Sequence, residues 1–267
     1  MPDIDRTVLL EAISALTGTT VKPHTENSKG HSSYEELTIE NFLLTVLRPT
    51  SSQPALTSLL KKLSLSSESE SAQCDGASAL RKELFVDMEN FLDPRFDYDF
   101  SDDSDSDSEE CTRGGEPYTR PWGWYRFALK VLDKYPDGNA WLGPNGWRSQ
   151  SSPGEWPVSF HGTSIEGARG IARSNYRAGD RQAYGRGIYS TPDIDIAEGY
   201  AMSKKFRSKN GRTYEVIMQN RINPKKRVIT GKEDYWLIPV PEGSSAEQEK
   251  QIVEASIRPY GILIKEV

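Results

Sequence analysis

Cysteine is scarce in this sequence of 267 residues, which contains only Cys74 and Cys111. Two thiols cannot build the multi-bridge framework of a small secreted domain, and they cannot supply four ligands to a structural zinc ion. We therefore expect chemistry without a metal. A charged-then-apolar leader and a run of about 18 apolar residues are also missing. These absences favour a soluble, intracellular protein, cytoplasmic or nuclear, with no membrane partner.

An excess of positive charge is lacking as well. Lys and Arg number 33 against 39 Asp and Glu, which gives a formal net charge of -6. Nonspecific binding to nucleic acid depends on clustered Lys and Arg, because these side chains neutralise the phosphate backbone. The charge balance therefore argues against a general affinity for nucleic acid.

Residues 1–96 are predicted to form a small helical region. Apolar side chains recur at helical spacing over 7–16 and again over 38–47, where Thr38 can cap the helix and Pro49 ends the pattern. A third such stretch covers 56–65. We interpret these helices as packing or partner-docking elements without catalytic groups. A fragment that lacks residues 1–110 is accordingly expected to stay soluble.

Residues 97–116 are predicted to be an acidic, disordered linker. Its main part, 97–110, reads DYDFSDDSDSDSEE. A block of like charge and serine cannot bury enough apolar surface to offset the entropy lost on ordering. The alternative interpretation is a phosphorylatable acidic segment that binds a basic partner.

Residues 117–267 are predicted to form the main domain, with a tryptophan-rich lead-in. Five of the six tryptophans lie between positions 122 and 156, and such aromatic density is typical of buried contacts. The pattern over 124–135 predicts an amphipathic helix with Arg126, Lys130 and Lys134 in solvent. The alternative for this aromatic and basic segment is stacking on single-stranded bases.

After this lead-in, the pattern predicts short strands and helices. Residues 156–162 read as a strand, residues 164–174 as a short helix, and a loop rich in glycine and arginine then returns to a strand at 188–189. Further strands are predicted over 213–219, 234–240 and 257–267. These elements indicate an α+β fold built around antiparallel sheets.

Three short motifs follow one another in this domain, namely His161-Gly162-Thr163, Gly185-Arg186-Gly187-Ile188-Tyr189-Ser190, and Ala197 through Tyr200-Ala201. Their order and spacing resemble the catalytic domain of the poly(ADP-ribose) polymerase and diphtheria-toxin superfamily of ADP-ribosyltransferases. Each motif alone is weak, whereas the combination is specific. The likeness continues through 234–238 and 257–264 and covers about 110 residues. It implies split antiparallel β-sheets with short helices, preceded here by the small helical region.

The resemblance implies that the domain binds NAD as a substrate. In this family the histidine of the first motif hydrogen-bonds a ribose hydroxyl on the adenosine side, and the next glycine's backbone holds the nicotinamide carboxamide. The matching residues are His161 and Gly162, with Thr163 beside them. A histidine buried in the core is the alternative interpretation.

The second and third motifs supply the remaining predicted contacts to NAD. Tyr189 and Tyr200 match the tyrosines that lie against the two faces of the nicotinamide ring, which gains from aromatic stacking because it is electron-poor. Arg186 and Gly187 complete the predicted binding set. Tyrosines of the ordinary core are the alternative interpretation.

A carboxylate is the last member of the predicted site. Cleavage of the bond between nicotinamide and ribose builds positive charge on the sugar, which a fixed carboxylate stabilises. Asp234 matches the family's acid, and Glu233 is the second candidate, because neighbouring side chains of a strand face opposite ways. Solvated turn acids are the alternative. The sequence departs from the family at Asp234, where glutamate is usual, and at Ala197, where many relatives have a serine for the carboxamide.

The resemblance thus predicts an enzyme that transfers ADP-ribose from NAD to a macromolecule and releases nicotinamide. A single transfer to a protein acceptor is favoured over chain extension or a nucleic-acid acceptor. The alternative is a catalytically silent domain of the same fold that binds NAD or a protein partner, which the departures at Ala197 and Asp234 favour.

Overall fold

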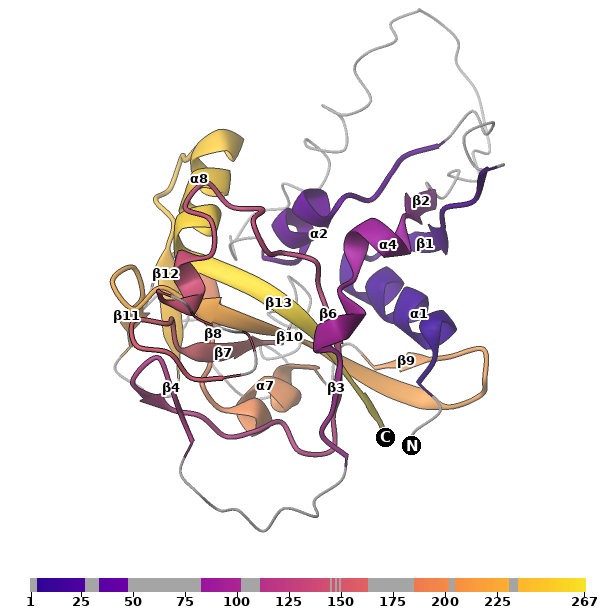
Figure 1. Ribbon diagram of the computed structural model, residues 1–267. Coiled ribbons are helices and arrows are strands. Elements are labelled where there is room, and N and C mark those ends of the chain that lie inside the picture. The colour runs from indigo at the N-terminus through magenta and orange to yellow at the C-terminus, as the bar shows by residue number, and fades with distance from the viewer. Residues whose placement is uncertain are drawn as a thin grey trace, which may run out of the picture.

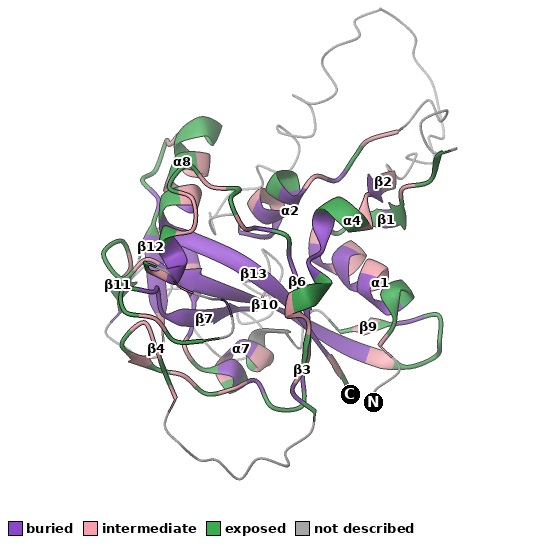
Figure 2. Ribbon diagram, in the orientation of Figure 1, coloured by how far each residue is buried: buried purple, intermediate pink, exposed green. Residues whose placement is uncertain are grey.

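A computed structural model describes residues 4–26, 34–47, 83–101, 111–144, 146, 148, 150–162, 185–201, 205–230 and 235–267, with only the backbone described at 200 and 201. These residues form short helices and antiparallel sheets, so the predicted α+β class is confirmed. Figure 1 shows two long strands, β10 (Thr213–Ile222) and β13 (Ile257–Glu266), crossing the middle of the molecule. Both are almost entirely buried (Figure 2).

The larger sheet has six strands, and all of its pairs are antiparallel. β13 lies between β10 and β6, β7 pairs with the other edge of β10, and β9 pairs with its start. The strands predicted over 213–219 and 257–267 are therefore confirmed, and β10 continues to Ile222. The remaining strands are β3 (Tyr98–Asp99), β6 (Tyr125–Ala128), β7 (Val158–His161) and β9 (Phe206–Arg207).

The smaller sheet has three antiparallel strands in the order β11-β12-β8. An isolated bridge between Phe160 and Thr191 joins its β8 edge to β7 of the larger sheet. The two sheets therefore diverge at the β7–β8 junction. The strands are β8 (Gly187–Ser190), β11 (Val228–Ile229) and β12 (Trp236–Pro239).

Helices cover both faces of the larger sheet. Successive side chains of β10 point to opposite faces, so neighbouring residues pack in different apolar clusters. Met218 packs in one apolar cluster with side chains of α1 and α2, whereas Ile217 packs in a second cluster with Phe160 and α7. The helices are α1 (Arg6–Thr17), α2 (Ile39–Val46), α4 (Met88–Phe91), α7 (Ile194–Ala201) and α8 (Ala246–Ser256), with 3-10 turns η2 (Pro94–Phe96) and η3 (Ala140–Leu142). None of the helices in the described ranges is long and apolar enough to cross a membrane.

The first two predicted helices are confirmed, and each begins at a capping side chain. The Asp5 carboxylate accepts the backbone N–H of Thr7 at 2.8 Å and starts α1, which ends at Gly18 with φ of 69°. Thr38 caps α2 as the sequence predicted, by accepting the N–H of Asn41 at 3.2 Å. The third predicted stretch, 56–65, lies outside the described residues.

A boundary at residue 96 does not separate two cores in the described part of the chain. Leu9 and Phe42 of the N-terminal helices are fully buried in the same cluster as Val216 and Ile262 of the larger sheet. The N-terminal region also contains a parallel pair of strands, β1 (Thr20–Pro23) and β2 (Glu83–Val86). It is therefore one wall of the main core rather than a separate helical region.

The prediction of disorder over 97–116 is wrong at both ends of that segment. Residues 98–99 form β3 against β6, and Phe100 is only 5% exposed. Asp97 accepts the N–H of Ala128 at 2.7 Å, so its carboxylate has a partner inside the fold. Residues 112–117 form a hairpin of β4 (Thr112–Arg113) and β5 (Glu116–Pro117). The middle of the linker, 102–110, lies outside the described residues.

The helix predicted over 124–135 is wrong, since residues 125–128 form β6 between β3 and β13. Aromatic side chains here favour a strand, and pairing on both sides decides the conformation. Arg126, which was expected in solvent, is half-buried and donates to the Gln219 side chain and to the Phe96 carbonyl. The tryptophans were correctly predicted as packed at Trp124 and Trp141, which are 1% and 0% exposed.

Candidate active site

His161 lies at the end of β7, where the two sheets diverge. Its Nδ1 atom is 2.6 Å from the carbonyl oxygen of Tyr189 on β8. The two residues are 28 positions apart in the sequence, and the Phe160–Thr191 bridge holds their strands together. The fold thus brings the first motif and the second motif into direct contact.

A second backbone carbonyl faces the other nitrogen of the same ring. Nε2 of His161 is 3.3 Å from the oxygen of Val46, the last residue of α2. Burial lowers the pKa of His161 despite these two carbonyls, so the ring is neutral near pH 7. The neutral ring carries one N–H, and the shorter contact places it on Nδ1, donating to the Tyr189 oxygen.

Tyr189 is half-buried on β8, opposite Leu237 of β12. Its hydroxyl donates to the carbonyl of Gly185 at 2.6 Å, which ties the side chain to the loop just before the strand. Its neighbours Ile188 and Ser190 are buried, as alternation along a strand requires. The predicted strand edge at 188–189 is confirmed.

Gly187 and Arg186 have structural contacts that sequence reasoning did not anticipate. A Cβ atom at Gly187 would lie 2.2 Å from the carbonyl oxygen of Ile238, so β12 approaches too closely for any side chain. The Arg186 guanidinium donates to the Pro241 carbonyl at 2.7 Å and forms an ion pair with Glu249 of α8. Binding of NAD by these two residues stays a prediction.

The remaining predicted residues are only partly described. Gly162 follows His161 directly and is half-buried. Tyr200 belongs to α7 by its backbone. Thr163, Glu233 and Asp234 lie outside the described residues, although β12 begins two residues after Asp234. The structure therefore brings His161 into contact with Tyr189. Gly162 is next to the histidine in the chain, Arg186 and Gly187 precede the tyrosine, and the acid is not described.

Ala197 occupies a different environment from the one that the resemblance implies. Its side chain is fully buried in the cluster that contains Val158 and Phe160. A serine here would place its hydroxyl in an apolar core, where an unpaired hydroxyl is unfavourable. Packing therefore favours a small apolar side chain at this position.

Three buried polar side chains near His161 were missed by sequence reasoning. Ser159 lies on the same face of β7 as His161, opposite Asn220 of β10. The Oγ atoms of Ser159 and Ser190 and the Oδ1 atom of Asn220 are buried without a hydrogen-bond partner. The sequence could have shown that Ser159 shares a strand face with His161, because the two are two positions apart. It could not have shown the contact with Val46, which lies 115 positions from His161.

A large cavity lies elsewhere, beside the residues that precede β7. Its volume is about 850 Å³, and its lining includes Gly114, Ser151, Glu155, Trp156 and Lys225. It contains none of the predicted site residues. Among the described residues, moreover, no three His, Cys, Asp or Glu side chains are grouped so that they could hold a metal ion.

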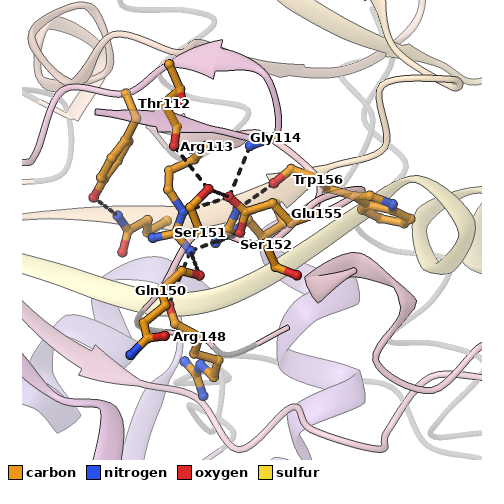
Figure 3. Close-up of polar contacts among 12 residues, drawn as sticks. Thr112, Arg113, Gly114, Arg148, Gln150, Ser151, Ser152, Glu155 and Trp156 are labelled. Atoms are coloured by element: carbon orange, nitrogen blue, oxygen red, sulfur yellow. Dashed lines mark hydrogen bonds and ion pairs between the residues drawn. The ribbon is translucent and has the colours of Figure 1, made fainter. Parts of the chain in front are cut away.

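Glu155, which lines this cavity, belongs to a buried ion network. Figure 3 shows its polar contacts. The Glu155 carboxylate contacts Arg113 at 2.9 Å and Arg221 at 3.1 Å, and it accepts the N–H of Gly114 and the hydroxyl of Ser151. Burial opposes ionisation of Glu155, but the Arg113 hydrogen bond and the Arg221 charge outweigh it, so its pKa is lowered. The carboxylate is fully satisfied within the fold, which is typical of a structural anchor.

Comparison of the chain with protein-family models finds no match, and comparison with curated proteins finds no significant match either.

Proposed function

We propose that this chain is an NAD-dependent ADP-ribosyltransferase that transfers ADP-ribose to a protein acceptor and releases nicotinamide. The observation that carries the proposal is the contact between His161 and Tyr189 at the β7–β8 junction. Two motifs that resemblance assigned to one site come from separate segments, and they meet where two antiparallel sheets diverge.

Each residue of the proposed site has a separate role toward NAD. Neutral His161, with Nδ1–H committed to Tyr189, presents Nε2 as an acceptor for a ribose hydroxyl of NAD. The Tyr189 ring offers an aromatic face to the nicotinamide. Asp234 or Glu233 supplies the carboxylate that stabilises the positive charge on the ribose as nicotinamide leaves.

Turnover of labelled NAD by the purified chain tests this proposal. We expect label in the protein and free nicotinamide from the unmodified chain. His161→Ala and Tyr189→Ala should each lower the rate by about 100-fold or more, because each removes a group that positions the reacting sugar. His24→Ala and Tyr98→Ala, which change the same residue types away from the junction, should leave the rate unchanged.

Two other outcomes lead to different conclusions. NAD binding without nicotinamide release would favour the catalytically silent binding domain. Label incorporation that survives both site substitutions would remove the β7–β8 junction from the reaction. Separate Asp234→Ala and Glu233→Ala variants, compared in turnover and in NAD binding, identify the acid, since loss of a transition-state contact lowers turnover more than binding.

A further inference from the structure

β11 is the open edge of the smaller sheet. In the order β11-β12-β8 it has no second neighbour among the described strands. Just beyond the paired residues, the N–H of Thr230 donates to the Tyr235 carbonyl at 3.0 Å. Hydrogen-bonded and non-hydrogen-bonded pairs alternate along an antiparallel ladder, so the N–H and C=O of Ile229 point away from β12. One backbone donor and one acceptor therefore face outward at this edge.

The same edge is apolar. Val228 and Ile229 are 47% and 52% exposed, and they are the only adjacent pair of exposed large apolar side chains among the described residues. The edge of the larger sheet at β3 differs, because Asp99 places a charge there. Charged side chains commonly protect an edge against pairing with another chain. β11 has no charge within the strand, so its edge can accept a further extended segment.

The turn that leads into β11 is basic. Lys225 and Lys226 are exposed, and neither forms an ion pair with another described residue. Arg227, in contrast, pairs with Glu116 and lies 3.8 Å from the Trp236 ring. Lys225 also lines the cavity of about 850 Å³, so there is space beside the turn. Two lysines without a partner favour an acidic occupant, whereas a second copy of the chain would bring its own lysines to this edge.

The register of the smaller sheet relates this edge to the candidate site. Val228 lies opposite Leu237, and Leu237 lies opposite Tyr189. Residues directly opposite each other share a face of the sheet. Neighbouring strands are about 4.8 Å apart, so the backbones of Val228 and Tyr189 are about 10 Å apart across the sheet. A strand added to β11 would extend this row on the face that carries the Tyr189 side chain.

We infer that β11 docks an extended, acidic segment of the acceptor protein, which adds to the smaller sheet as its fourth strand. Backbone hydrogen bonds at Ile229 hold the segment, and apolar contacts with Val228 and Ile229 fix its register. Its acidic side chains lie beside Lys225 and Lys226. The inference rests on the proposed function only in calling this partner the acceptor.

Binding of two labelled probe peptides to the full chain, measured by fluorescence anisotropy without NAD, tests the inference. The acidic probe is EETVTVTVEE, and KKTVTVTVKK is the matched basic probe with the same strand-forming centre. We expect the acidic probe to bind and the basic probe to bind at least about tenfold more weakly, because like charges oppose each other at the turn.

A substitution in β11 tests the backbone hydrogen bonds. Ile229→Pro removes the outward N–H but no bond to β12, and proline is tolerated at such edge positions. Binding of the acidic probe should fall by at least about tenfold, since strand addition depends on main-chain bonds. Ile229→Val is the matched control, because it keeps the N–H and a β-branched side chain, and it should bind as the unmodified chain does.

Charge reversal at the turn is an independent test that leaves the strand intact. Lys225→Glu combined with Lys226→Glu should shift the preference to the basic probe. The control combines Arg207→Glu with Lys209→Glu, which are exposed at and just after β9. Figure 1 shows β9 and β11 on opposite sides of the molecule, so this control should keep the preference for the acidic probe.

The outcomes separate this inference from the proposed function. Equal binding of the two probes, or binding that Ile229→Pro leaves unchanged, would overturn the docking surface. A dimer that Ile229→Pro abolishes, without binding of either probe, would assign the edge to a second copy and overturn it as well. Because NAD is absent from the measurement, a chain that binds the acidic probe without turning over NAD contradicts only the proposed enzyme. Turnover of NAD without probe binding contradicts only the docking surface.

Discussion

Three arginine side chains surround the ring of Tyr260. The guanidinium groups of Arg126, Arg148 and Arg221 lie 5.6, 5.4 and 5.8 Å from its ring. Burial and the nearby charge of Arg126 lower the pKa of Arg148 to about 10. Arg148 donates to the carbonyls of Leu129 and Tyr260 at 2.9 and 2.6 Å. Carbonyl oxygens and one aromatic ring thus stabilise much of this positive charge.

Glu155 is the carboxylate that neutralises part of this cluster, so its replacement should be costly. Glu155→Gln leaves Arg221, which is 1% exposed, without its charged partner. We expect a loss of about 3 kcal/mol in the free energy of unfolding at pH 7, since breaking a buried pair strands the remaining charge. Chemical denaturation measures this loss, and Glu242→Gln on the surface is the control.

The same residue should make stability depend on acid. Because the folded pKa of Glu155 lies below its ordinary value of 4.5, the unfolded chain takes up this proton first as the pH falls. The contribution is therefore complete above about pH 5 and disappears as the pH falls through the depressed pKa. Unfolding curves between pH 6 and pH 3 should show a shallower acid dependence in Glu155→Gln, and parallel curves would contradict this account.

The sequence indicates some residues of the β7–β8 junction and not others, and their roles toward NAD stay predictions. The sequence indicates His161, Gly162 and Tyr189 because each belongs to a short motif that can be recognised from neighbouring residues. It does not indicate Val46, since the carbonyl of that residue reaches His161 across 115 positions and a backbone oxygen leaves no trace in residue type. Arg186 is described with a different partner, because its pairing with Glu249 depends on where α8 packs.

At the scale of elements, β8 and β12 can lie so close together because Gly187 has no side chain. Gly187→Ala would place a methyl group 2.2 Å from the Ile238 backbone oxygen, which cannot turn aside as a side chain can. We expect a loss of about 1–3 kcal/mol from overpacking. Thermal unfolding of the full chain measures this change.

Gly199→Ala is the matched control for that substitution. Gly199 lies on the exposed side of α7, and no atom lies within 4 Å of the position that its Cβ would take. Alanine should stabilise this helix by about 0.5–1 kcal/mol, because glycine loses more backbone entropy on folding. Equal effects of the two substitutions would show that the strand contact does not require glycine.

Elements were predicted best where one residue pattern had a single interpretation. β10 and β13 were found because long runs of β-branched and aromatic residues fit a buried strand. β6 was misread because Phe127, Ala128 and Val131 also repeat at helical spacing, and only its two neighbouring strands decide between the forms. α8 was overlooked although Ser245 and Gln248 form a capping box, which is a local signal.

At the scale of the whole molecule, the N-terminal region cannot be removed without opening the core. α1 and α2 cover one face of the larger sheet, where Val216, Met218 and Ile262 are fully buried. Truncation of residues 1–96 would expose these side chains at about 1.5–3 kcal/mol each. We therefore expect the fragment 97–267 to aggregate, contrary to the soluble fragment without residues 1–110 that the sequence predicts.

Size-exclusion chromatography of the fragment and of the full chain checks this expectation. Co-expression of residues 1–96 as a separate chain is the control, because it restores the missing wall without a covalent link. A soluble, monomeric fragment 97–267 with cooperative unfolding would show that the sheet is stable alone and that the boundary drawn from the sequence is correct.

The position of β13 in the larger sheet has a consequence for how the chain is made. β13 lies between β6 and β10, and both of these strands precede it in the sequence. The pairs β6-β13 and β13-β10 therefore cannot form until residues 257–266 have been synthesised. Synthesis from the N-terminus thus places closure of the sheet late, and exposed edges at that stage invite chaperone capture or aggregation.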